Sequence, residues 1–150
     1  MRVVIQRVKH AQVAVNGKIR SQIKTGLLVL LGITHDDNEA DADWLVQKIS
    51  KMRIFDDESG VMNCSVVDIE GEVLVVSQFT LMAATQKGNR PSYIRAARPE
   101  HAKPLYEYFI AQLNQNLNHP VGTGEFGADM QMTLLNDGPV TILMDTHNKE

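Results

Sequence analysis

This chain of 150 residues contains a single cysteine, no long hydrophobic run and no recognisable secretory signal. The one cysteine, Cys64, excludes an intrachain disulfide framework. The longest unbroken aliphatic stretch, Leu27 to Leu31, is far too short to cross a bilayer, and the first residues lack the apolar segment that directs secretion. These absences favour a soluble, cytoplasmic protein with no membrane partner.

Metal-binding patterns are also missing. The five histidines form no H-x-H or H-x-x-x-H pair, and one cysteine cannot build a zinc knuckle. Acidic residues cluster between Asp36 and Asp43, but they gather where a helix is expected to begin and where they would offset its dipole. The G-x-G-x-x-G string from Gly122 to Gly127 neither follows a strand nor opens a helix, so it indicates a flexible turn. We expect no metal ion and no dinucleotide.

Charge is segregated along the chain although the net charge is only −3. Residues 1–35 contain six basic and no acidic side chains, and residues 36–72 contain eleven acidic against three basic ones. Residues 73–104 are basic again, with five basic side chains against one acid. A local basic surface facing phosphate is compatible with this pattern, and so is ordinary solvated surface charge.

The apolar pattern predicts short strands separated by clear turns, together with two helices. Asn16-Gly17 is a strong hairpin signal, and the 14-residue segment from Glu39 to Met52 places its apolar residues on one helical stripe. A second helix opens near Pro99, after a basic loop over residues 82–98. The predicted strands are Val3–Val8, Gln12–Val15, Lys18–Ile23, Gly26–Ile33, Val66–Ile69, Glu72–Val76, Met130–Leu135 and Val140–Met144. The expected fold is a single α/β domain with mixed, largely antiparallel sheets layered with two main helices.

Ser77-Gln78-Phe79-Thr80-Leu81 follows the buried strand Glu72–Val76 directly. A strand end holds chemical groups rigidly while the following loop leaves them accessible. The Thr80 hydroxyl would need a base to act as a nucleophile, and the string contains no histidine or carboxylate. The N–H groups of Phe79 and Thr80 are alternative candidates, as donors to the oxyanion of an acyl transfer. From composition and spacing alone, a plain strand end with a capping hydroxyl is the favoured interpretation.

Asn136-Asp137-Gly138-Pro139-Val140-Thr141 joins the last two predicted strands. Glycine allows close approach of the backbone to a ligand, and proline fixes φ and is the residue type most often preceded by a cis bond. Gly138 and Pro139 therefore form either a tight turn or a rigid main-chain probe.

These two strings, together with Lys87–Ser92, Gln6-Arg7-Val8 and Phe126–Met130, closely resemble the D-aminoacyl-tRNA deacylase family over the whole chain. The resemblance implies hydrolysis of the ester that joins a D-amino acid to the 3′ end of tRNA, without a cofactor. It also implies a homodimer with the active site at the subunit interface.

The resemblance assigns site residues as well. Gly138 and Pro139, joined by a cis bond, would enter the site of the partner subunit and meet its Ser77 to Leu81 strand end, with Arg7 as a buttress. Ser77, Gln78, Phe79 and Thr80 would form the catalytic segment. In one interpretation Thr80 is the nucleophile, and in another the backbone groups of Phe79 and Thr80 act together with the 2′-hydroxyl of the terminal adenosine.

The physical logic of such a filter is steric. An enzyme that accepts many D side chains must read the substituents on the substrate Cα directly, and backbone carbonyls at Gly138 and Pro139 would accept hydrogen bonds from the ammonium group while excluding an L side chain. Because glycine has no side chain to exclude, glycyl-tRNA is expected to be a substrate too.

Basic side chains of the middle of the chain are candidates for tRNA binding through phosphates: Lys87, Arg90, Arg95, Arg98 and Lys103. Two other functions remain open. A noncatalytic nucleic-acid-binding module would explain the basic segments, and a small-ester hydrolase would use Thr80 without RNA.

Overall fold

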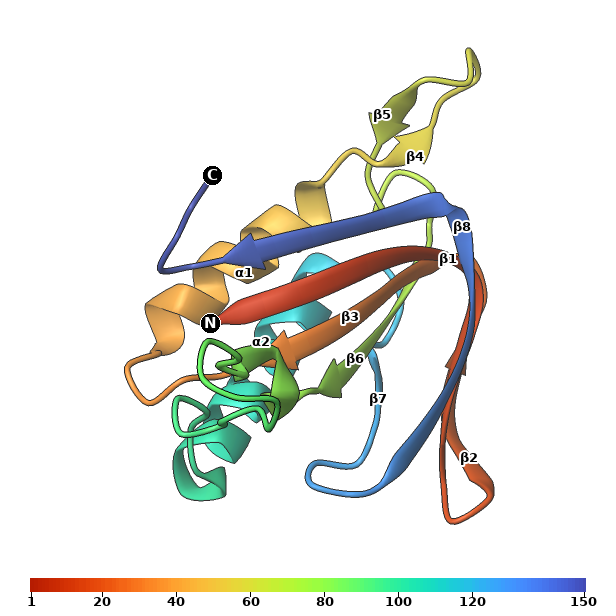
Figure 1. Ribbon diagram of the computed structural model, residues 1–150. Coiled ribbons are helices and arrows are strands. Elements are labelled where there is room, and N and C mark those ends of the chain that lie inside the picture. The colour runs from red at the N-terminus through yellow and green to blue at the C-terminus, as the bar shows by residue number, and fades with distance from the viewer.

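A six-stranded mixed sheet forms the centre of the molecule (Figure 1), and the computed structural model describes residues 1–150. Strands β1 (Arg2–Val15) and β3 (Gly26–Gly32) are antiparallel neighbours, whereas β3, β6 (Glu72–Ser77) and β7 (Gly122–Thr123) run parallel to one another. In spatial order the strands are β2 (Lys18–Ile23), β1, β3, β6 and β7, and β8 (Met130–Asp145) pairs antiparallel with the other side of β1. Together with the two helices described below, this is the mixed, largely antiparallel α/β fold predicted from the sequence.

Strand β1 is continuous where the sequence predicts two strands, Val3–Val8 and Gln12–Val15. Its first half pairs with β3 and its second half with β2, while β8 runs along both halves. The segments join because β8 stays paired through the region between them, where the register shifts on either side of Val8. Asn16 and Gly17, both at positive φ, close the predicted hairpin to β2.

Strand β8 is likewise one element where the sequence predicts strands Met130–Leu135 and Val140–Met144 with a turn between them. The prediction of a turn at Gly138-Pro139 is wrong, because the chain does not reverse there. Both halves pair with the same strand, β1, and the residues between them form a wide bulge. A hairpin turn would require the two halves to pair with each other. In the structure each half instead forms its own ladder of hydrogen bonds with β1.

Strands β3 and β6 form the buried centre of the sheet, and nearly all of their residues are shielded on both faces, as predicted for Gly26–Ile33. The predicted hairpin between Val66–Ile69 and Glu72–Val76 is wrong. The first segment is a turn, in which the Asp68 carboxylate accepts hydrogen bonds from the N–H and the hydroxyl of Ser65, each at 2.8 Å. Such a side-chain acceptor competes with the strand ladder for backbone donors, so only the second segment becomes a strand.

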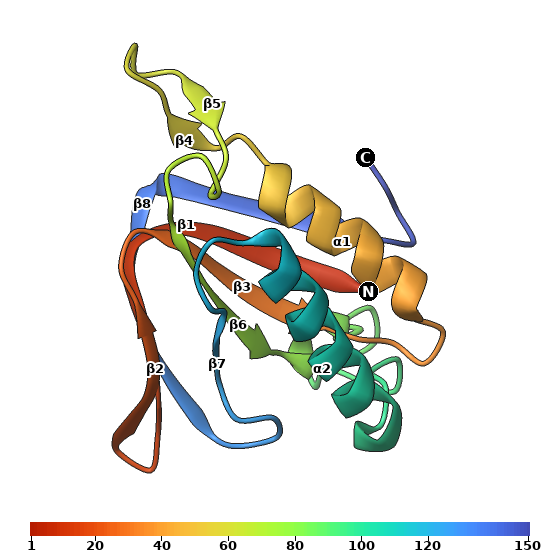
Figure 2. The same cartoon turned by 180° about the vertical axis from the view of Figure 1, so that it is seen from behind.

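Two helices, α1 (Glu39–Lys51) and α2 (Pro99–Asn116), cover one face of the sheet (Figure 2). Helix α1 begins with a capping box, in which the Asn38 side chain accepts from Ala40 N–H (2.9 Å) and the Asp41 carboxylate accepts from Asn38 N–H (3.0 Å). Neither helix combines the length and apolarity needed to span a membrane. The core between helices and sheet includes Val3, Ile5, Leu27, Val29, Leu45, Ile49, Val75, Leu105, Phe109 and Leu113.

A short hairpin that the sequence did not reveal projects from this body (Figure 1). Its strands are β4 (Phe55–Asp56) and β5 (Met62–Cys64), which form a separate two-stranded sheet. The Asp57 carboxylate organises its turn by accepting from the N–H groups of Ser59 (2.9 Å) and Val61 (3.1 Å). The strands are too short to produce a detectable alternating pattern.

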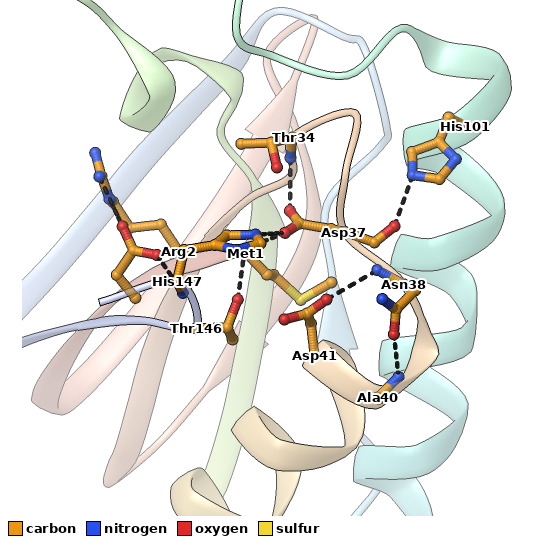
Figure 3. A network of polar contacts seen from close by, with 11 residues as sticks. Met1, Arg2, Thr34, Asp37, Asn38, Ala40, Asp41, His101, Thr146 and His147 are labelled. Atoms are coloured by element: carbon orange, nitrogen blue, oxygen red, sulfur yellow. Dashed lines mark hydrogen bonds and ion pairs between the residues drawn. The ribbon is translucent and has the colours of Figure 1, made fainter. Parts of the chain in front are cut away.

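The acidic cluster at the start of α1 serves two purposes (Figure 3). Glu39 and Asp41 lie in the first turn of the helix, as expected for compensation of its dipole. Asp37 is instead buried, and its carboxylate accepts from the Met1 ammonium group, from Thr34 N–H (2.6 Å) and from His147 Nε2 (2.7 Å). The cluster therefore ties the first residue of the chain to the end of β8.

Candidate active site

The end of β6 is fixed firmly against β3. Gln78 N–H donates to Leu31 O at 2.8 Å, and the chain then enters a short 3-10 helix, η1 (Phe79–Met82). Gly32 of β3 permits this close approach, because a Cβ at that position would lie 2.9 Å from Met82 Cε and 3.1 Å from Gln78 O. The Ser77–Thr80 segment is thus a rigid strand end, as expected.

Two backbone donors are free at this strand end. The first hydrogen bond of η1 runs from Leu81 N–H to Gln78 O (3.2 Å), so the N–H groups of Phe79 and Thr80 have no acceptor within the helix. The Thr80 hydroxyl accepts a hydrogen bond from the Gln78 side-chain amide at 2.5 Å and makes none to a histidine or a carboxylate. The segment therefore presents donors but no base.

A cavity of about 610 Å³ opens beside the strand end. Ser77, Gln78 and Phe79 form one wall, and most of the remaining wall is apolar. The Phe79 ring is 59% exposed and meets the Tyr93 ring edge to face, with 5.2 Å between centroids. The segment Phe126–Met130 lines the same cavity, so the structure brings together two strings that carry the family resemblance.

The aromatic wall is firmly packed on its far side. The Phe126 ring lies 5.7 Å from that of Tyr106, whose hydroxyl donates to Val75 O at 3.1 Å. Burial raises the pKa of Tyr106 to about 12. Tyr106 therefore stays un-ionised near neutral pH and supports the cavity wall through its packing and hydrogen bond.

Gly138 and Pro139 lie exposed in the bulge of β8, opposite Arg7 of β1, and the peptide bond between them is cis. Asn136 closes the base of the bulge: its side-chain amide donates to Arg7 O (3.0 Å) and to Val140 O (2.9 Å). Gly138 has a φ of +129°, and a Cβ there would lie 2.8 Å from Val140 Cγ2 and 3.2 Å from Arg7 Nη2. Only glycine fits this position without displacement of its neighbours.

Arg7 supports the bulge directly. Its side chain is almost fully buried, and Nε donates to Asp137 O at 3.1 Å while Nη1 donates to Ile54 O at 2.7 Å. The guanidinium group therefore links the backbone that precedes Gly138 to the segment that follows α1.

Within one chain the structure does not bring the bulge and the strand end together. Arg2 Nη1 donates to Leu81 O at 2.8 Å, which places the start of β1 at the strand end, whereas Arg7 lies at the bulge. Arg7 lies five residue steps along β1 from Arg2, a span of about 17 Å. Gly138 and Thr80 of the same subunit are thus too far apart to act on one ester bond.

The five predicted tRNA-binding side chains are all exposed, and none forms an ion pair. Lys87 and Arg90 lie in the loop that leads to Tyr93 on the cavity rim. Lys103 and Phe126 line a second, smaller depression next to the cavity. Arg95 and Arg98 flank Ala96 and Ala97, which line the cavity itself.

Sequence reasoning missed three groups that shape the site. Tyr93 forms part of the cavity wall, Arg2 binds the carbonyl of Leu81, and Asn136 clamps the bulge. Asn136 was visible as part of its string, but an isolated tyrosine and an N-terminal arginine carry no local signal.

The sequence matches the family model described as D-Tyr-tRNA(Tyr) deacylase over residues 4–145. Curated proteins named D-aminoacyl-tRNA deacylase are similar along their full length: that of Porphyromonas gingivalis is 62% identical and that of Bacteroides thetaiotaomicron 59% identical, each over 150 residues and 100% of both chains.

Two solved structures resemble the chain. The structure titled "c-Myc DNA Unwinding Element Binding Protein" has a TM-score of 0.92 at 42% identity and covers 97% of this chain and 99% of its own. A second, titled as a structural analysis of a probable eukaryotic D-amino acid tRNA deacylase, has a TM-score of 0.80 at 17% identity and covers 95% and 97%, a likeness that shows the fold alone.

Proposed function

We propose, starting from the fact that this chain belongs to the D-Tyr-tRNA(Tyr) deacylase family, that it hydrolyses the ester bond of D-aminoacyl-tRNA and releases free tRNA and the D-amino acid. The observation that carries the proposal is the rigid strand end, where the N–H groups of Phe79 and Thr80 are free and Ser77, Gln78 and Phe79 line an apolar cavity. A tRNA substrate supports a cytoplasmic location for this activity.

The cavity is suited to the terminal adenosine of tRNA. Its volume of about 610 Å³ lies in the range of small-molecule sites, and its lining is mainly apolar. Unpaired bases are bound in proteins by stacking on aromatic rings, which Phe79, Tyr93 and Phe126 supply here. An adenine held in the cavity would leave its ribose, and the ester on that ribose, at Ser77–Thr80.

The ester carbonyl would be activated by backbone groups. In our proposal the N–H groups of Phe79 and Thr80 donate to the carbonyl oxygen, which becomes negatively charged when water attacks the carbon. The bond from the carbonyl carbon to the ribose oxygen then breaks, and the ribose oxygen takes up the proton that water loses. The 2′-hydroxyl of the adenosine is placed to relay that proton, because Thr80 has no base beside it.

Selection for D substrates would come from Gly138 and Pro139 of a partner subunit. The structure supports this arrangement, because the strand end contacts Arg2 and the bulge contacts Arg7, about 17 Å further along β1, so that a single chain cannot place both at one ester. Main-chain carbonyls of the pair would accept hydrogen bonds from the substrate ammonium group and leave no room for an L side chain. On this steric basis, glycyl-tRNA would be hydrolysed too.

The exposed basic side chains around the cavity would hold the acceptor end of the tRNA through its phosphates: Lys87, Arg90, Arg95, Arg98 and Lys103. Such contacts carry no base specificity, so tRNAs of different identity are expected to bind alike.

A single assay tests the proposed function. Purified protein is mixed with D-tyrosyl-tRNA, L-tyrosyl-tRNA or a free D-tyrosyl ester, and released tyrosine is measured. Selective release from D-tyrosyl-tRNA supports the deacylase. Binding of tRNA without release would instead identify a binding module, and equal attack on the free ester would identify a general esterase. Glycyl-tRNA as a fourth substrate tests the steric account.

A further inference from the structure

The Arg7 guanidinium group is held from two sides by segments that are far apart in the sequence. Nε faces the bulge of β8, where it donates to Asp137 O at 3.1 Å. Nη1 faces the start of the β4–β5 hairpin, where it donates to Ile54 O at 2.7 Å. In Figure 1 the hairpin stands beside the bend of β8. The two hydrogen bonds place the Arg7 guanidinium group at the junction between them.

Two carboxylates complete this junction. The Asp56 carboxylate of β4 lies 3.5 Å from Arg7 Nη1, and the Asp137 carboxylate lies 3.4 Å from Arg7 Nε. Lys9 Nζ also approaches Asp137, at 3.5 Å, so that carboxylate is shared by two cations. Asp56 pairs with Arg7 alone, and it is the one charged group that connects the hairpin to the bulge.

The third nitrogen of the guanidinium group reaches the glycine of the bulge. Arg7 Nη2 forms no hydrogen bond within the chain and lies only 3.2 Å from the position that a Cβ of Gly138 would occupy. A guanidinium group is planar and rigid, so a shift of Nη1 at the hairpin must also move Nη2 at Gly138. The position of the hairpin is thereby transmitted to the proposed stereochemical filter.

We propose that Asp56 is a positioning residue, through which the β4–β5 hairpin fixes Arg7 against Gly138 and so sets the discrimination between D and L substrates. This inference rests on the proposed function, because it assumes that Gly138 and Pro139 read the substrate Cα. Neighbouring acids of the hairpin do not share the role: Asp57 organises the turn, and Glu58 is exposed with no partner.

The test compares Asp56→Asn with Glu58→Gln, a matched removal of charge from the same hairpin. The ratio of kcat/KM for D-tyrosyl-tRNA over L-tyrosyl-tRNA is measured for both. Asp56 is 54% exposed, so its loss is expected to lower the ratio by about two- to fivefold, the range of a solvated ion pair. The Glu58→Gln protein keeps the ratio of the original protein, and KM for tRNA stays the same in both.

Two further readouts separate positioning from a general loss of structure. Asp56→Glu keeps the negative charge and is expected to restore most of the D to L ratio that Asp56→Asn loses. The melting temperatures of the variants are expected to agree. Raising the salt concentration should lower the ratio in the original protein but not in Asp56→Asn, because salt screens the ion pair. An unchanged ratio in Asp56→Asn, or a lowered ratio that Asp56→Glu fails to restore, would overturn the proposal.

Gly138→Ala, measured alongside, shows which idea fails. If Gly138→Ala disturbs the D to L ratio and Asp56→Asn does not, the role of Asp56 is rejected and the filter stands. If neither variant changes the ratio while D-tyrosyl-tRNA is still hydrolysed selectively, the filter itself is misplaced.

Discussion

The Gln78 side-chain amide donates a hydrogen bond to the Thr80 hydroxyl at 2.5 Å. An amide N–H is a donor and cannot remove the proton of the hydroxyl group. Thr80 is therefore oriented by its neighbour without being activated, and this relationship favours the backbone mechanism over a threonine nucleophile.

Thr80→Ala is accordingly expected to reduce kcat for D-tyrosyl-tRNA by less than about tenfold, because the backbone N–H groups remain. Loss of a true nucleophile lowers kcat by several orders of magnitude. Single-turnover rates distinguish the two outcomes. Thr25→Ala, at an exposed position between β2 and β3, is the control and should behave like the original protein. A drop of a thousandfold or more in Thr80→Ala would restore the nucleophile hypothesis.

Gly138→Ala is expected to destabilise the bulge and to lower the rate on D-tyrosyl-tRNA by at least about tenfold. The new Cβ would meet Val140 Cγ2 at 2.8 Å, and a φ of +129° is strained for any L residue at a cost of about 1–3 kcal/mol. Gly17→Ala is the matched control, since Gly17 also has positive φ but has open space around it. Gly17→Ala should lose stability and keep its activity, as measured by denaturation and by release of tyrosine.

Tyr93→Ala is expected to raise KM for D-tyrosyl-tRNA by about five- to 150-fold with little change in kcat, because stacking of a base on an aromatic ring contributes about 1–3 kcal/mol. Steady-state kinetics on D-tyrosyl-tRNA measure this split. Ile19→Ala, an exposed apolar residue on β2, provides the control. A pure kcat effect in Tyr93→Ala would show that the cavity does not hold the terminal base.

Removal of both Lys87 and Arg90 is expected to weaken tRNA binding equally for tRNAs of different identity. The slope of log K against log salt should become shallower by about 0.7–0.9 for each lost phosphate contact. Filter binding across a salt series provides the measurement, with Lys18→Ala on β2 as the control. An unchanged slope in the double variant would exclude this loop from the tRNA-binding surface.

Asp145 is expected to stabilise the fold near neutral pH through Arg2. Burial opposes ionisation of its carboxyl, but four effects together outweigh it and hold the pKa below its usual value: the hydrogen bonds from Arg2 at 2.7 and 3.0 Å, the hydrogen bond from His147 N–H, and the positive charges of Arg2 and the N-terminus. A lowered pKa adds stability above the unfolded-state value of about 3.9, and this contribution disappears as the pH falls through the folded-state pKa.

Asp145→Asn should therefore reduce the free energy of unfolding by about 1 kcal/mol at pH 7. The difference between the two proteins should vanish in strong acid. Urea denaturation from pH 7 into strong acid, below the folded-state pKa of Asp145, tests this, with Glu58→Gln as a control that shows no such trend. A difference that persists unchanged at low pH would mean that packing, and not charge, holds Asp145.

Much of the fold followed from local patterns in the sequence. Asn16-Gly17 predicted its hairpin because both residues tolerate positive φ, and the stripe of Leu45 and Ile49 predicted α1 because its period matches a helix. The hairpin at residues 66–76 was predicted wrongly, since a side-chain hydrogen bond from Ser65 to Asp68 decided the turn.

The features of the candidate site likewise fall into those that the sequence predicted and those that only the structure revealed. The sequence alone determined the family and the strand end at Ser77–Thr80, and it singled out Gly138-Pro139 as a candidate, because these depend on residue type and local order. Only the tertiary structure decided that Gly138 lies in a bulge held by Arg7 and not in a turn, and that Phe126 and Phe79 share one cavity. These relationships arise from strand pairing and packing between distant segments, which leave no periodic trace in the chain.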